Sequence, residues 1–155
     1  MLLLLVSCYG VRYARIDAGG GRLQIFELAV YNSSGGNASQ GKSTSASSEF
    51  VNDACPYYIS GPVDGVLLAK NFYNCVYKGY VSDAASGAYW QVDLESSQTI
   101  TKVLYYNRGD YGASNAAYYT ITLLNAASGT VCSCSTFTSD LIQDLSLLAG
   151  IVCMW

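Results

Sequence analysis

Short stretches of alternating apolar and polar residues run along the chain, and Gly, Ser and Asn separate them. The alternation is clearest at residues 90–94 and 119–123, where every second side chain is apolar. This period is typical of β-strands with one buried face. Further strands are expected at residues 11–18, 22–31, 99–106 and 130–136. So many short strands separated by turns predict an all-β sandwich.

Three places modify this simple pattern. Residues 22–31 change face halfway along, and a β-bulge between Ile25 and Phe26 would keep both halves against the core, with Leu23 on one face and Leu28 on the other. The polar residues 95–97 predict a turn between two separate strands. Residues 141–155 form the only segment that permits a helix, although residues 152–155 could instead pair as a closing strand. We therefore expect little or no helix.

Two segments, residues 49–61 and 67–87, carry no strand pattern, and long irregular segments in a small domain usually carry function. They are rich in tyrosine, and Tyr77 and Tyr80 are our candidates for contacting a ligand. A tyrosine offers a large apolar area and a hydroxyl group at low entropic cost. The alternative is that these tyrosines only pack the loops against the sandwich.

Composition limits the function classes. The 155 residues suit a single domain, residues 1–155. The absence of histidine excludes Ser-His-Asp and Cys-His catalysis and His-ligated metals. A net charge of -3 argues against nucleic acid as a partner, and no apolar run is long enough for a membrane span. No motif pairs two of the eleven acidic residues as a glycosidase does, so we expect no enzyme activity.

Six cysteines in a short chain indicate an oxidising compartment and hence a secreted, extracellular protein. Two glycosylation sequons, at Asn32 and Asn37, agree with this location. The apolar run at residues 2–6 is shorter than the core of a secretion signal, and we interpret it as part of an ordered first strand.

Six motifs occur in order between residues 10 and 137. They are FELAVY (residues 26–31), GKSTSASS (41–48), VDG (63–65), YWQVDL (89–94), YNRGD (106–110) and TITLL (120–124). In this order they resemble the discoidin family, also called the coagulation factor 5/8 C-terminal domain, with its fucose-binding lectin branch. The resemblance implies a jelly-roll β-sandwich of galactose-binding-like topology. It also implies a non-enzymatic module that binds sugars, phospholipid or protein at one end of the barrel.

The resemblance points to a sugar site around Arg108 and Asp110. Fucose-binding members carry a His, then Arg-x-Asp, then a further basic residue. Arg108 and Asp110 match the central pair, whereas the His position falls near Val81 and the basic position near Asn115. A guanidinium and a carboxylate together can serve the donors and acceptors of adjacent sugar hydroxyls. The alternative is that Arg108 and Asp110 pair with each other and pin a turn.

The family often holds calcium beside an Asp-Gly loop. Asp64 matches this position, but Val66 stands where an Asn commonly follows the Gly. Calcium takes six to eight oxygen ligands, and backbone carbonyls would have to supply several of them. We expect no cofactor other than this optional calcium ion.

Cysteine pairing is open to several solutions. Family members commonly join the two chain ends, a role that fits Cys8 and Cys153. Cys55 and Cys75 bracket the irregular segments and could stiffen them. The remaining pair, Cys132 and Cys134, lies two residues apart on one strand face, so a bond between them would be strained. They could pair with other cysteines or with another chain, stay reduced, or join a four-thiolate zinc site.

Two function classes follow. The first is a non-catalytic extracellular recognition or adhesion module of the carbohydrate-binding type, with glycans or extracellular matrix as partners. The alternative is a self-associating structural subunit of an extracellular fibre or matrix, in which the sugar site is degenerate. Self-association is suggested by the low charge (12% of residues) and by the apolar segments 2–6 and 145–155.

Overall fold

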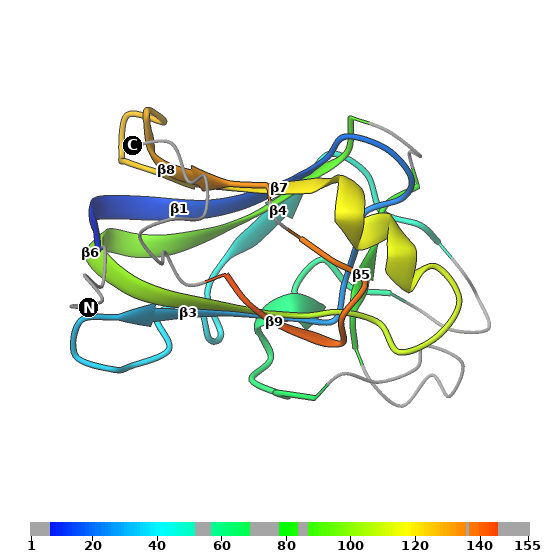
Figure 1. Ribbon diagram of the computed structural model, residues 1–155. Helices are drawn as coiled ribbons and strands as arrows, with labels where there is room; N and C mark the ends of the chain where they lie inside the picture. The colour runs from blue at the N-terminus through cyan, green and yellow to red at the C-terminus, as the bar shows by residue number, and fades with distance from the viewer. Residues whose placement is uncertain (1–6, 52–56, 69–77, 84–86, 136, 146–155) are drawn as a thin grey trace.

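Antiparallel strands form the two layers of the fold, with the core between them (Figure 1). The computed structural model describes residues 7–51, 57–68, 78–83, 87–135 and 137–145. Its strands are β1 (Cys8–Ala18), β2 (Gln24–Ile25), β3 (Glu27–Asn32), β4 (Thr44–Ala46), β5 (Tyr80–Val81), β6 (Tyr89–Tyr106), β7 (Tyr119–Leu124), β8 (Thr130–Cys134) and β9 (Ile142–Asp144). Two short 3₁₀ helices, η1 (Gly61–Val63) and η3 (Ala113–Tyr118), are the helical elements among these residues. The predicted all-β class with little helix is confirmed.

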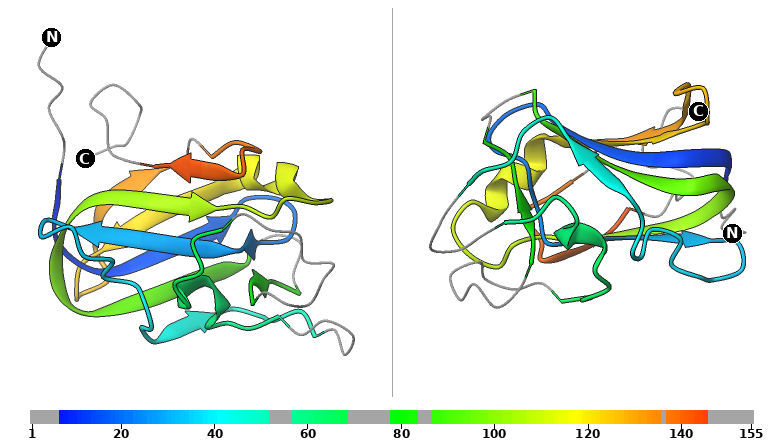
Figure 2. Two further views of the ribbon diagram at one scale, coloured as in Figure 1. Left: turned by 90° about the horizontal axis from the view of Figure 1, so that it is seen from below. Right: turned by 180° about the vertical axis from the view of Figure 1, so that it is seen from behind.

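Strand β6 belongs to both layers. Its first half pairs with β1 and β4, and its second half pairs with β3 and β9. Figure 2 shows β3, the second half of β6 and β9 side by side in one layer. The chain doubles back at residues 95–97 as the predicted turn requires (Figure 2), but β6 continues through the bend as one strand where two separate strands were expected. Glu95 adopts a φ of 67°, and its N–H donates to Asp93 Oδ1 at 2.7 Å, which supports the bend.

The alternating strands behave as predicted. Trp90 and Val92 of β6 are fully buried, as is Ile16 of β1, which pairs with Trp90 on one side and with Ile121 of β7 on the other. These side chains meet in the main core between the layers. The order β3-β6-β1-β7-β8 places β1 at the centre of the sheet.

The change of face at residues 22–31 is real, but its cause is a strand break and not a bulge. β2 ends at Ile25 and pairs with β5, whereas β3 begins at Glu27 and pairs with β6. Ile25 and Leu28 therefore both reach the main core. Phe26, at the break, packs in a second, smaller cluster with Ala29, Val81 and Tyr106, and Phe50 and Tyr57 pack against it.

The C-terminal segment contributes a strand to the sheet. Residues Ile142–Asp144 form β9 and pair with β6, so this part of the predicted helical segment is extended. The expected closing strand at residues 152–155 and the expected first strand at residues 2–6 lie outside the described residues. Among the residues that the structure describes, no helix has the length and apolarity to cross a membrane.

The disulfide joins Cys8 to Cys132, which corrects the expected Cys8–Cys153 link. β7 ends opposite Tyr13 of β1, so the first residues of β1 extend past β7 and approach β8, where Cys132 lies. The two Cα atoms are 6.2 Å apart, within the range that a disulfide spans. Cys134 is buried in the main core on the same face as Cys132, as the spacing predicted. The three remaining cysteines lie outside the described residues; they are Cys55, Cys75 and Cys153.

Candidate functional site

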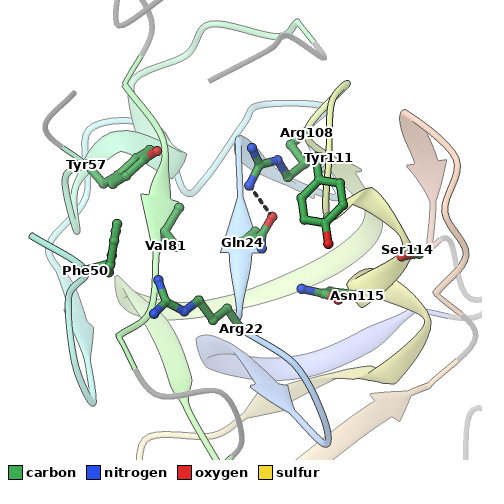
Figure 3. Close-up of a pocket in the computed structure, with 10 residues that line it drawn as sticks. Arg22, Gln24, Phe50, Tyr57, Val81, Arg108, Tyr111, Ser114 and Asn115 are labelled. Carbon is green, nitrogen blue, oxygen red and sulfur yellow. Dashed lines mark hydrogen bonds between the residues drawn. The ribbon is translucent and has the colours of Figure 1, made fainter. Parts of the chain in front are cut away.

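A pocket of about 470 Å³ opens at the end of the sandwich away from the bend in β6 (Figure 3). Segments distant in sequence meet here: the loop before β2 and β2 itself, β5, the irregular segment after β4, and the loop from β6 through η3. The residues that line it are Arg22, Gln24, Phe50, Tyr57, Val81, Arg108, Tyr111, Gly112, Ser114 and Asn115. It is thus lined by cationic, amide and aromatic side chains.

Arg108 is held in this pocket by the turn that follows β6. Asn107 is buried; its Oδ1 accepts the Arg108 N–H at 2.9 Å and its Nδ2 donates to the Ala113 carbonyl at 2.9 Å. The Arg108 Nε donates to Asp110 Oδ1. Arg108 Nη1 donates to Gln24 Oε1 at 2.7 Å. The expectation that Arg108 and Asp110 pair and pin the turn is confirmed, and Arg108 also lines the pocket.

Burial makes this arrangement rigid. The Arg108 and Asp110 side chains are only 13% and 5% exposed, so water competes weakly for their ion pair. Gln24 is fixed through its backbone, because Tyr105 donates from its hydroxyl to the Gln24 carbonyl at 2.6 Å and Tyr119 Oη accepts the Gln24 N–H at 3.0 Å. Burial raises the pKa of both tyrosines above the ordinary value, so both hydroxyls remain protonated at neutral pH.

A second guanidinium, that of Arg22, lies on the other side of Gln24 in Figure 3. Its Cζ lies 4.2 Å from the centre of the Phe50 ring, a cation–π contact. The Phe50 and Tyr57 rings lie 6.0 Å apart and form one wall of the pocket. The Arg22 backbone is anchored independently, since its carbonyl accepts the Tyr119 hydroxyl at 2.6 Å. Arg22 makes no ion pair with any described residue.

The opposite wall consists of Tyr111, Ser114 and Asn115 (Figure 3). Tyr111 is 87% exposed and stands at the mouth of the pocket. Gly112 separates it from η3 with a φ of 98°, and a Cβ there would lie 3.0 Å from Gln24 Oε1. A glycine at this position therefore serves both the backbone conformation and the close approach of Gln24.

The sequence positions singled out by the family resemblance converge here. Val81 and Asn115, where a histidine and a basic residue were expected, both line the pocket with Arg108. Tyr80 must be corrected as a ligand-contacting residue: its side chain is fully buried and its hydroxyl donates to the Ser48 carbonyl at 2.6 Å. Because neighbouring residues of a strand face opposite ways, Val81 faces the pocket instead. Tyr77 lies outside the described residues.

Sequence reasoning missed Arg22, Gln24 and Phe50 as site residues. Two signals were available in the sequence. The glycine run at residues 19–21 immediately precedes Arg22, and such a run is typical of a loop. The change of face after Ile25 also marked the end of a short separate strand to which Gln24 belongs. Neither signal tells which distant segments meet beside these residues.

The candidate calcium residue, Asp64, lies in a turn beside a buried carboxyl group. Asp64 Oδ1 accepts the Val66 N–H at 2.9 Å, and the Gly65 N–H donates to Glu27 Oε1 at 3.1 Å. Glu27 is fully buried, and its Oε2 has no hydrogen-bond partner. Burial first, and then the nearby charge of Asp64, raise the pKa of Glu27 to about 8. Gly65 has a φ of 86° and leaves no room for a Cβ beside Gln40.

An oxygen-seeking cation fits these two carboxyl groups. A cation would satisfy the buried Oε2 of Glu27 and offset its repulsion by Asp64. The described residues contain no cluster of three or more His, Cys, Asp or Glu side chains that could hold a metal. Backbone carbonyls or water would therefore have to complete the shell.

The two sequons differ in how the fold uses them. Asn37 Oδ1 accepts the Ser39 hydroxyl at 2.7 Å and the Val30 N–H at 3.1 Å, and Ser39 is fully buried. The Asn37 sequon is thus held against β3 by these hydrogen bonds. Asn32 Oδ1 accepts the Ser34 hydroxyl at 2.7 Å in an exposed turn, so the first sequon lies at the surface.

Comparison of the chain with protein-family models, with curated protein sequences and with solved structures finds no match. The functional argument therefore depends on the geometry and chemistry of the pocket.

Proposed function

We propose that the protein is a non-catalytic carbohydrate-binding module that binds a small saccharide in the pocket around Arg108. The observation that carries the proposal is the Arg108 guanidinium, fixed by Asp110 and Gln24 inside a pocket of about 470 Å³. That volume lies within the range of small-ligand pockets. Fixed polar groups in a concave site bind with little loss of side-chain entropy.

The pocket offers the two kinds of contact that sugars use. Polar groups for the hydroxyls come from Arg108, Gln24 and Asn115, and among the described residues neither Gln24 Nε2 nor the Asn115 side-chain amide makes a hydrogen bond. An aromatic surface for the apolar face of a sugar ring comes from Tyr111 at the mouth. The discoidin-like order of motifs supports the same class of ligand.

Binding without hydrolysis fits the charges of the pocket better than catalysis does. Among the described residues the lining contains no carboxylate, and the adjacent Asp110 is engaged by Arg108. A glycosidase needs two carboxyl groups flanking the scissile bond. We further infer that the module acts outside the cell, because the Cys8–Cys132 disulfide is compatible with a secreted protein.

A calcium ion would be held by Glu27 and Asp64 in this proposal. The role of the ion would be structural, because it would neutralise two neighbouring carboxyl groups and connect the Asp64-Gly65 turn to β3. It would not take part in contacting the sugar, because neither residue lines the pocket.

A glycan array tests the proposal, with wild type compared with Arg108→Ala. We expect wild type to bind a restricted set of glycans and Arg108→Ala to lose at least ten-fold in affinity, because a desolvated charge-assisted contact is lost. The matched control is Arg15→Ala, which removes an arginine from a second Arg-x-Asp pair, with Asp17, that lies outside the pocket lining. Silence of wild type on every glycan would overturn the proposal.

A second candidate function is a self-associating structural subunit. The supporting observation is two pairs of adjacent exposed apolar side chains, Leu67 with Leu68 and Leu141 with Ile142. Size-exclusion chromatography with light scattering separates the two candidates. A mass that grows with concentration, together with a silent glycan array, favours the subunit, whereas a constant monomer mass excludes it.

A further inference from the structure

We infer that the pocket selects an acidic saccharide, and that Arg22 binds its anionic substituent, a carboxylate or a sulfate. The inference rests on the proposed sugar-binding function and adds the charge of the ligand to it. It starts from the balance of charges in the pocket.

Two guanidinium groups line the pocket, and only one of them has an ion-pair partner among the described residues. Asp110 pairs with Arg108 in a nearly buried ion pair. Arg22 makes no ion pair with a described residue, and none of the described residues that line the pocket is acidic. The described part of the pocket thus carries an excess of one positive charge in a protein whose net charge is -3. Such a concave cationic site in an acidic protein attracts anions selectively.

The contact of Arg22 with Phe50 prepares the guanidinium for an anion. The ring covers one face of the guanidinium at 4.2 Å, which restricts its rotamers and removes water from that face. The edge of a guanidinium carries its N–H donors, and these match the two oxygens of a carboxylate or sulfate. In Figure 3 Gln24 lies between the two arginines, so a ligand that spans the pocket can reach both.

The two arginines would therefore have different roles. Arg108, already neutralised by Asp110, suits the neutral hydroxyls of a sugar. Arg22, which has no ion-pair partner among the described residues, suits an acidic group on the same ring or on a neighbouring one. Asn115, on the opposite wall, adds a side-chain amide that makes no hydrogen bond within the described residues.

The test is calorimetric titration with three sugars that share one ring: galactose, galacturonic acid and galactose 6-sulfate. We expect wild type to bind at least one acidic sugar ten-fold or more tightly than galactose, and added NaCl to reduce this preference. Arg22→Gln should abolish the preference, so that neither acidic sugar binds more tightly than galactose does to the same variant. The Arg22 side chain can be changed without loss of the fold, because the Tyr119 hydrogen bond uses the Arg22 carbonyl.

The control Arg15→Gln should keep the wild-type preference. Equal affinity of wild type for galactose and for both acidic sugars would overturn the inference and leave the sugar-binding proposal standing. A preference that survives Arg22→Gln would also overturn it. Failure to bind any sugar, neutral or acidic, would overturn both. The ratio between galacturonic acid and galactose 6-sulfate distinguishes a carboxylate ligand from a sulfate ligand.

Discussion

At the scale of single residues, Glu27 is the most unusual group in the described structure. A carboxyl group with no exposed surface and one unpartnered oxygen favours its neutral form, and its pKa rises to about 8. The folded protein thus keeps a proton that the unfolded chain has released above pH 4.5. Stability is linked to this difference in bound protons.

The free energy of unfolding should therefore fall as pH rises from 4.5 to about 8, and level off above that. The total change is on the order of a few kcal/mol, since one unit of pKa corresponds to about 1.4 kcal/mol. Glu27→Gln, a neutral side chain of the same shape, should remove this slope and be more stable than wild type above pH 8. Urea unfolding at several pH values measures both effects.

Calcium gives a second readout on the same variant. If Glu27 and Asp64 hold a cation, millimolar calcium raises the melting temperature of wild type at alkaline pH and leaves that of Glu27→Gln unchanged. An equal response of both proteins, or no response of wild type, contradicts a calcium site here. A pH slope that persists in Glu27→Gln contradicts the role given to the carboxyl group.

Gly112 connects a single backbone conformation to the pocket. Gly112→Ala should lower stability by about 1 kcal/mol because of its φ of 98°, and should also weaken sugar binding, because the new Cβ displaces Gln24. Gly41→Ala is the matched control: its φ is 68°, but a Cβ there meets open space. Chemical denaturation and titration calorimetry measure the two effects. Unchanged sugar affinity in Gly112→Ala would contradict the positioning role of Gln24.

At the scale of elements, the alternation of apolar and polar residues predicts a strand well where only one face of that strand lies against the core. The strands at residues 90–94 and 119–123 lie where the pattern places them, with their apolar side chains buried. The polar residues 95–97 mark the place where the chain doubles back, but one continuous strand, β6, carries the bend (Figure 2). A bend in a long strand and a turn between two strands have the same composition, so the sequence does not distinguish them.

Only some of the pocket residues could be predicted from the sequence, because the others come from distant segments of the chain. Arg108 and Asp110 form a local motif, so their pairing can be expected from sequence. Arg22 and Phe50 come from segments far from that motif, and only the packing of β2 beside β5 and η3 brings them to it. Tyr80 was misplaced because an irregular segment hides the short strand β5, in which Tyr80 faces the core and Val81 the pocket.

The Cys8–Cys132 disulfide ties the start of β1 to β8, across 124 residues of sequence. Replacing both residues, Cys8→Ser with Cys132→Ser, should lower the free energy of unfolding by about 2–5 kcal/mol, because the unfolded chain gains entropy. Sugar affinity should stay unchanged, since neither residue lines the pocket. Denaturation and calorimetry measure these effects, and non-reducing peptide mapping checks the pairing. A recovered Cys8–Cys153 peptide would contradict it.

At the scale of the whole molecule, the sandwich separates stability from recognition. The main core holds the two layers together and the disulfide ties β1 to β8, whereas the pocket lies at the end where irregular segments meet. The second cluster, around Phe26 and Val81, links the two, because Phe50 and Tyr57 pack on it and form a wall of the pocket. Substitution of residues that line the pocket should therefore reduce stability less than substitution of the core residues beneath the pocket.

The central claim is that a saccharide binds in the pocket around Arg108. The most direct measurement is an NMR titration of the isotope-labelled protein with the sugar that binds best on the glycan array. The account predicts saturable shifts at the Arg22, Arg108 and Asn115 signals, and loss of these shifts in Arg108→Ala but not in Arg15→Ala. Shifts confined to residues outside the pocket, or no saturable shifts at all, would contradict the account.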